Sequence, residues 1–280
     1  MVNQMLRQAN GVKLAVLVNE FGALPIDEDL IEAQDDELIS IAGGCICSSF
    51  GSDLTAAMIN LTELSPAPDH IIIETSGVAL PGAIAHSLSI LPGITVDGIC
   101  VLADCANVKT QASDDYIGAT ITRQFADAKL LLLTKADLVS HTVLADVQNW
   151  LASSWPNTRQ IVAEQGRVPN AVLLGQFTVS GSFSVGKHHD AAYDSVFLAC
   201  RTPRDVAALV TQMTEPKLGV LRAKGFVEDL SGRRALVQIV GATSEVTYPD
   251  APAGLGVICI GLAGVLDKAA LLEMGEDALA

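Results

Sequence analysis

Short aliphatic runs that end in polar residues recur along the first half of the chain. They are LAVLV (14–18), HIIIE (70–74), GICVLAD (98–104) and KLLLLTKAD (129–137). Apolar runs of this length are typical of strands buried on both faces of a parallel sheet. Helix-compatible stretches at 53–64, with Asp53 as a candidate N-cap, and at 78–90 lie between them. The alternation predicts a doubly wound, mostly parallel α/β sheet.

The polar ends of these runs predict where a ligand binds. In open α/β sheets, ligands bind beyond the carboxyl ends of the strands. The residues expected at this edge are Asn19-Glu20, Glu74-Thr75-Ser76, Asp104 and Thr134-Lys135-Ala136-Asp137.

The pattern changes after about residue 170. A Gly/Ser/His-containing connector at 178–194 is followed by a strand at 195–200 and a helix that opens at 202–210. Two strands joined by a turn at Ser231-Gly232, a strand at 256–262 and a C-terminal helix follow. We therefore predict an α/β domain at 1–175, a linker at 176–193 and a small α+β domain with a mainly antiparallel sheet at 194–280.

Composition excludes several classes of partner. The net charge of −15, from 17 basic and 32 acidic residues, argues against nucleic acid or an anionic membrane. The start of the chain has no apolar signal region, and the longest weakly polar run (254–266) is too short to span a bilayer. We expect a cytoplasmic protein with reduced cysteines. The sequence leaves a homodimer open.

TKAD (134–137) directly follows four leucines. A lysine at a strand end with an aspartate two residues later suits a guanine base. The Asp137 carboxylate would accept hydrogen bonds from the ring N1–H and the exocyclic amine, and the stem of Lys135 would cover the nucleotide. Taken alone, the four residues are weak evidence, and an ordinary loop with Asp137 as a helix N-cap is the favoured interpretation.

IIIETSG (71–77) places Glu74 at the end of a buried strand. A carboxylate there is suited to orient hydrated Mg²⁺ or an attacking water beside a γ-phosphate. Gly77 would allow the backbone to approach phosphate or to pivot. An ordinary strand-end turn is the alternative.

GGCICSSFGSDL (43–54) puts two of the six cysteines one residue apart. Two thiolates suit a soft ion such as Zn²⁺, but tetrahedral coordination then needs further ligands. The alternative is that Cys45 and Cys47 are small buried residues beside a glycine turn.

The motifs NEFG (19–22), GGCICS (43–48), ETSG (74–77) and TKAD (134–137), in this order, resemble the CobW-type (CobW/HypB/UreG) P-loop GTPases. Relatives of these GTPases serve urease and hydrogenase maturation. VLRAKGFV (220–227) resembles the strand that marks the CobW C-terminal domain, and LVQIVG (236–241) fits the strand after it. The resemblance spans nearly the whole chain.

The resemblance implies a GTPase that hydrolyses GTP with Mg²⁺ and delivers a metal, often Zn²⁺ or Co²⁺, to a client metalloprotein. Thr134, Lys135 and Asp137 would then bind guanine, with Glu74 in the Mg²⁺ and water shell and Gly77 beside phosphate. In the family's GCxCC motif, Cys45 and Cys47 match the first two thiols and Ser48 stands at the third. Glu20 is the nearest further metal ligand by this analogy.

One part of the family pattern is missing. A GTPase of this fold opens with a strand and a G-x-x-x-x-G-K-[ST] loop that holds the phosphates, and no such sequence occurs in the 280 residues. The first residues resemble the second half of the following helix, with Gly11 as its C-cap. We interpret the chain as beginning inside that helix, through a late start codon or a truncated gene. We expect phosphate affinity and catalysis to be almost absent, and the sheet to have unpaired strand edges and exposed aliphatic surface.

Two other functions remain open from the sequence. One is a non-catalytic metal-binding or adaptor protein built on a degenerate GTPase scaffold. The other is reductive thiol chemistry at the cysteine pair, which ranks last because the thioredoxin-like C-x-x-C context is missing.

Overall fold

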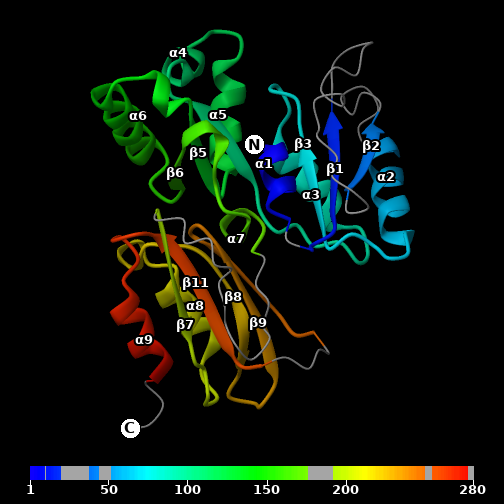
Figure 1. The fold of residues 1–280 in the computed structure, drawn as a ribbon, viewed down its shortest axis with the longest axis vertical. Coiled ribbons are helices and arrows are strands. Elements are labelled where there is room, and N and C mark those ends of the chain that lie inside the picture. Colours follow the sequence, from blue (N-terminus) through cyan, green and yellow to red (C-terminus); the bar gives the residue numbers. More distant parts are fainter. Residues whose placement is uncertain (10, 20–37, 44–51, 176–191, 250–253, 277–280) are drawn as a thin grey trace. The chain divides into compact units, whose positions relative to one another are not determined.

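The structure is a computed structural model that describes residues 1–9, 11–19, 38–43, 52–175, 192–249 and 254–276 (Figure 1). The chain divides into two compact units. The first unit is Met1–Trp155 with Ile161–Val168, and the second is Pro156–Gln160 with Pro169–Ala280. Residues 169–175, which the predicted boundary assigns to the first domain, therefore cluster with the second unit.

The first unit contains a three-stranded parallel sheet, here called the first sheet, with the order β2-β1-β3. Its strands are β1 (Leu14–Asn19), β2 (Leu38–Gly43) and β3 (His70–Glu74). The helices of this part are α1 (Val2–Arg7), α2 (Ser52–Glu63) and α3 (Pro81–Ser89). The aliphatic runs thus become parallel strands with helices between them, as predicted.

Two predicted helix ends are wrong. Asp53 lies inside α2, which already begins at Ser52, and is not its N-cap. Helix α1 ends at Arg7 with Gln8 as its C-cap. Gly11, the predicted C-cap, lies in the turn that follows, where its φ of 85° is accessible to glycine.

Another three-stranded sheet, here called the second sheet, has the order β4-β5-β6 and lies in the first unit except for Arg159 and Gln160 at the start of β6. Its strands are β4 (Cys100–Asp104), β5 (Leu130–Thr134) and β6 (Arg159–Ala163). The helices are α4 (Val108–Ala112), α5 (Gly118–Asp127) and α6 (His141–Ser154). β4 and β5 are parallel. All four leucines of β5 are fully buried, as expected for a strand covered on both faces.

The outer edges of β3 and β4 have no strand partner among the described residues. Leu102, in the middle of β4, is 54% exposed, which is unusual for a leucine in a parallel sheet. The described residues thus leave an unpaired edge on each of these two strands and an exposed leucine on β4.

The second unit is an antiparallel sheet with the order β10-β9-β8-β11-β7. Its strands are β7 (Tyr193–Leu198), β8 (Val220–Glu228), β9 (Arg234–Val240), β10 (Thr243–Thr247) and β11 (Gly256–Leu262). Its helices are α7 (Asn170–Leu173), α8 (Val206–Met213) and α9 (Lys268–Glu276).

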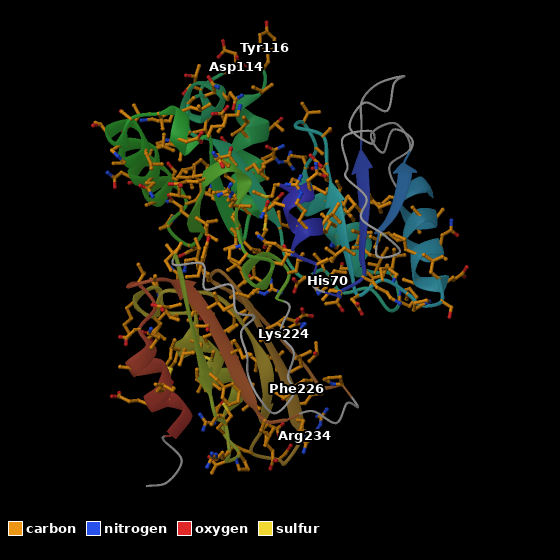
Figure 2. All side chains as sticks on the ribbon, in the orientation of Figure 1. His70, Asp114, Tyr116, Lys224, Phe226 and Arg234 are labelled. Atoms are coloured by element: carbon orange, nitrogen blue, oxygen red, sulfur yellow. The ribbon has the colours of Figure 1, made fainter. Side chains whose placement is uncertain are left out.

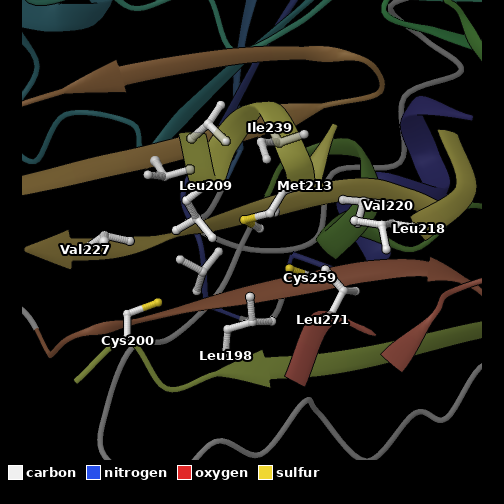
Figure 3. Close-up of a cluster of buried hydrophobic side chains, with 14 of the residues drawn as sticks. Leu198, Cys200, Leu209, Met213, Leu218, Val220, Val227, Ile239, Cys259 and Leu271 are labelled. Carbon is white, nitrogen blue, oxygen red and sulfur yellow. The ribbon is translucent and has the colours of Figure 1, made fainter. Parts of the chain in front are cut away.

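One core fills the second unit. Leu198, Met213, Ile239, Cys259 and Leu271 are fully buried in it, and they come from three strands and two helices (Figure 3). This confirms the predicted C-terminal α+β arrangement with a mainly antiparallel sheet. Among the described residues, no helix is both long enough and apolar enough to cross a membrane.

Candidate functional site

The carboxyl ends of β4 and β5 bring a lysine and an aspartate together. Asp104 and Thr134 are register partners at the ends of these parallel strands. Lys135, the next residue, has a left-handed backbone with φ 55° and ψ 27°. Its Nζ lies 2.8 Å from Oδ2 of Asp104. A non-glycine residue in this conformation is uncommon and marks a place where the surroundings fix the backbone.

Asp104 is the centre of a small hydrogen-bond network. Its Oδ1 accepts from the backbone N–H of Ala106 at 2.9 Å, and its Oδ2 accepts from Asn107 Nδ2 at 3.0 Å as well as from Lys135. Partial burial acts to raise the pKa of Asp104. The hydrogen bonds from Lys135, Asn107 and Ala106, with the charge of Lys135, outweigh burial and hold that pKa below its usual value. The carboxylate therefore stays charged and restrains the lysine.

Asp137 is positioned differently. It lies in the 3-10 turn η3 (Ala136–Leu138) directly after Lys135, and its side chain is exposed. Within the described part of the chain, no hydrogen bond or ion pair engages its carboxylate. Leu138 beside it is 71% exposed. The strand end thus presents two unengaged acceptor oxygens next to apolar surface.

Thr134 has a structural contact at this edge. Its hydroxyl donates to the carbonyl of Ala103 at 3.3 Å, which ties the ends of β4 and β5 together. Its role as a nucleotide ligand stays a prediction.

A second turn, which the sequence analysis did not identify, lies beside η3. This is η4 (Glu164–Gly166), which follows β6. Gln165 in it is exposed and has a φ of 50°, so this turn also contains a non-glycine residue in the left-handed region. Three consecutive strand ends, at Asp104, Lys135 and Gln165, therefore converge on one edge. The sequence signal for η4 is only a short polar run after an apolar strand.

Glu74 and Gly77 lie at the corresponding end of the first sheet. Glu74 is the exposed last residue of β3 and is the register partner of Val18 in β1. Gly77 follows in a turn, and a Cβ placed there would meet nothing within 4 Å. Packing in the structure therefore does not require glycine at this position. The predicted catalytic role of Glu74 and the phosphate contact of Gly77 stay predictions.

The predicted metal ligands Glu20, Cys45 and Cys47 lie outside the described residues. The strand ends to which they are attached are described. Asn19 at the end of β1 is the register partner of Gly43 at the end of β2. Glu20 directly follows the first, and Cys45 comes two residues after the second. Among the described residues, no three His, Cys, Asp or Glu side chains cluster as a metal site.

The fold and this edge define a class of protein, an α/β domain of the P-loop NTPase-like type. The family model for the CobW/HypB/UreG nucleotide-binding domain matches residues 1–163. The chain belongs to the CobW/HypB/UreG family.

Two curated relatives align along nearly the whole chain. The zinc chaperone CobW of Sinorhizobium sp is 29% identical over 322 residues, covering 97% of this chain and 90% of the relative. The zinc chaperone CobW of Pseudomonas aeruginosa is 28% identical over 331 residues, covering 100% and 88%. The Zn(II)-bound YjiA GTPase of E. coli is a similar solved structure, with 18% identity, a TM-score of 0.43 and coverage of 97% of this chain and 92% of that one.

Proposed function

We propose that this chain is a cytoplasmic metallochaperone that binds a guanine nucleotide and delivers Zn²⁺, or Co²⁺, to a client metalloprotein. The observation that carries the proposal is the pair of residues at the end of β5. Asp137 offers an exposed carboxylate with no partner in the described part of the chain, and Lys135 is held beside it by Asp104. The two relatives that align along the chain are named zinc chaperones.

The base specificity follows from hydrogen-bond chemistry. Guanine carries an N1–H and an exocyclic amine on one edge, and both can donate to the two oxygens of a carboxylate. Adenine has an acceptor at N1 and cannot make the same pair of bonds. The two side-chain oxygens of Asp137 therefore favour guanine. Lys135, with its Nζ drawn towards Asp104, leaves its aliphatic stem to cover the base.

Glu74 would serve the phosphate end of the nucleotide. When bound there, Mg²⁺ would neutralise phosphate charge, and a carboxylate at a strand end can hold its water shell. Glu74 is exposed at the carboxyl end of β3, the edge at which ligands of open α/β sheets bind. The 280 residues contain no G-x-x-x-x-G-K-[ST] sequence, so we expect the chain to recognise the base more strongly than the number of phosphates.

Cys45, Cys47 and Glu20 would hold the metal that is delivered. Two thiolates favour a soft divalent ion, and Glu20 would add an oxygen ligand. The described pairing of Asn19 with Gly43 starts both segments from neighbouring strand ends, about 4.8 Å apart. With Ser48 in place of a third thiol, we expect the metal to be held loosely enough for transfer.

Zinc titration against a competing chelator tests the metal half of the proposal. Wild type should compete for Zn²⁺, and the double variant Cys45→Ser/Cys47→Ser should not. Cys100→Ala is the matched control, because it removes a thiol from β4. Equal zinc affinity of wild type and the double variant would return the two cysteines to the role of small packing residues.

Competition between GDP and ADP for a fluorescent nucleotide tests the guanine half. We expect GDP to compete more strongly than ADP, and Asp137→Asn to reduce GDP affinity about 10- to 100-fold, because it replaces one acceptor with a donor. Asp115→Asn, at an exposed position in the α4–α5 connection, is the matched control. Zinc binding without any preference for guanine would support the non-catalytic metal-binding or adaptor protein instead.

A further inference from the structure

Helix α5 is hydrogen-bonded to the loop that follows Glu74. The side-chain nitrogen Nε2 of Gln124 donates to the backbone carbonyl of Gly77 at 3.0 Å and to that of Ala79 at 2.8 Å. Both acceptors are carbonyls, so only the amide nitrogen can face them. The contacts bridge more than forty residues of sequence and join a helix of the second sheet to a loop of the first.

Asp127, one turn later on α5, contacts the start of α3, the helix that follows this loop. Its Oδ2 accepts from the backbone N–H of Gly82 at 3.0 Å. Gly82 lies in the first turn of α3, and Leu80, the N-cap residue of that helix, makes no side-chain capping bond. Asp127 therefore supplies from another helix the acceptor that an N-cap side chain usually provides.

The other end of α5 is fixed within the second sheet. Asp114 Oδ1 accepts from the backbone N–H groups of Tyr116 at 2.8 Å and Ile117 at 3.1 Å, and this shapes the turn that leads into the helix (Figure 2). Phe125 is buried, and its ring packs edge-on against Trp155 with centroids 5.0 Å apart. The helix is thus anchored to the core of the second sheet.

α5 also leads directly to the proposed guanine site. Only Ala128 and Lys129 separate its last residue, Asp127, from β5. β5 is fully buried over its four leucines and ends at Thr134, immediately before Lys135. A shift of the end of β5 would therefore be transmitted to Asp127, because only a buried strand and two residues connect them.

We propose that Gln124 and Asp127 are positioning residues that fix residues 75–82 relative to the guanine end of the site. The backbone that follows Glu74 is then held at the position set by α5. A ligand that orders Lys135 and Asp137 would also order this loop. The effect of a ligand on the loop rests on the proposed function, whereas the positioning of the loop by Gln124 and Asp127 does not.

Hydrogen–deuterium exchange of the full chain without nucleotide tests the positioning. Gln124→Met keeps the length of the side chain and removes both donors, and Gln124→Glu replaces the donors with acceptors. Peptides covering 75–82 should exchange roughly 10-fold faster in both variants, because both hydrogen bonds from the Gln124 side chain to this loop are lost. β5 should keep its protection. Gln111→Glu, on the exposed side of α4, is the control for the charge change.

Asp127 gives a rescue experiment that separates positioning from general destabilisation. Asp127→Ala removes the acceptor for Gly82 and should accelerate exchange at 80–83. Asp127→Asn retains an acceptor oxygen and should restore protection. Unchanged exchange of the loop in Gln124→Met, or equal acceleration in β5 and the loop, would overturn the proposal.

Repeating the exchange measurement with nucleotide distinguishes failure of this proposal from failure of the proposed function. Saturating GDP with Mg²⁺ should slow exchange of 75–82 in wild type and leave it unchanged in Gln124→Met. Equal slowing in both proteins would overturn the link through α5. If GDP binds neither protein, the proposed guanine site fails and the ligand-dependent link fails with it. The nucleotide-free comparison then still decides whether Gln124 and Asp127 position the loop.

Discussion

Replacing Asp104 tests whether the edge at β4 and β5 is held together as the structure indicates. The side chain accepts hydrogen bonds from Ala106, Asn107 and Lys135. Asp104→Ala removes all three. Asp104→Asn keeps an oxygen that can still accept from the Ala106 N–H, but it loses the charge that attracts Lys135. The two variants therefore separate the turn from the ion pair.

The expected magnitudes follow from exposure. The Asp104 side chain is 18% exposed and that of Lys135 is 56% exposed, so water screens their ion pair. A pair of this kind contributes about 0.2–1 kcal/mol, and each of the other hydrogen bonds about 0.5–1.5 kcal/mol. We expect Asp104→Ala to lower the free energy of unfolding by about 2 kcal/mol and Asp104→Asn by about 0.5–1 kcal/mol.

Urea unfolding monitored by tryptophan fluorescence measures both values. The two tryptophans of the chain, Trp150 and Trp155, pack on Phe125 in the core of the second sheet. Their emission therefore reports unfolding of the part that contains Asp104. The slope of the free energy with urea concentration should be the same for all three proteins, because the surface exposed on unfolding is unchanged.

The pH dependence gives the sign of the electrostatic contribution. The folded protein lowers the pKa of Asp104, so the carboxylate stabilises the fold at pH above its unfolded pKa of about 3.9. This stabilisation is lost as the pH falls through the lower pKa of the folded state. The difference between wild type and Asp104→Asn should therefore shrink below about pH 4. Equal effects of Ala and Asn at pH 7, or a difference that grows on acidification, would refute the reasoning.

Three further predictions concern packing and thiols. Phe125→Ala should lower the free energy of unfolding by about 3–5 kcal/mol, because the ring is only 2% exposed, and the change is measured by the same urea titration. Gly225→Ala should prevent the second unit from folding, since the new Cβ would overlap the carbonyl oxygen of Gly256; heteronuclear NMR of the variant would show whether that sheet persists. Burial raises the pKa of the Cys200 and Cys259 thiols, so neither should be alkylated by iodoacetamide at pH 8 until urea is added, which mass spectrometry of the peptides measures.

Several strands of the first unit were predictable from their aliphatic runs. The four leucines of β5 are fully buried, as such a run predicts, whereas HIIIE corresponds residue for residue to β3 although no residue of that strand is fully buried. β10 (Thr243–Thr247) was missed because its sequence, TSEVT, has no such run. It lies at the edge of its sheet, where three of its five side chains are exposed. An edge strand with exposed side chains does not need a run of aliphatic residues, so the hydrophobic pattern by which strands are recognised is missing.

The positions of the candidate site residues were predictable where those residues are consecutive. Lys135 and Asp137 are found by their place after the apolar run, and the structure puts them at the carboxyl end of β5 as expected. The partner of Lys135 was not predictable, because Asp104 lies 31 residues away and meets it only through the register of two parallel strands. The contacts of Gln124, 45 and 47 residues away in sequence, depend in the same way on tertiary packing.

The arrangement of the first unit limits how nucleotide and metal binding could influence each other. The proposed metal ligands and Glu74 are attached to the strand ends of the first sheet, and the proposed guanine residues to those of the second. Among the described residues, a bound nucleotide and the contacts of α5 offer two physical routes between them. A guanine nucleoside without phosphates tests the second. If guanosine alters zinc affinity in wild type and not in Gln124→Met, we infer that the effect passes through α5. If only nucleotides with phosphates alter it, the nucleotide itself is the link.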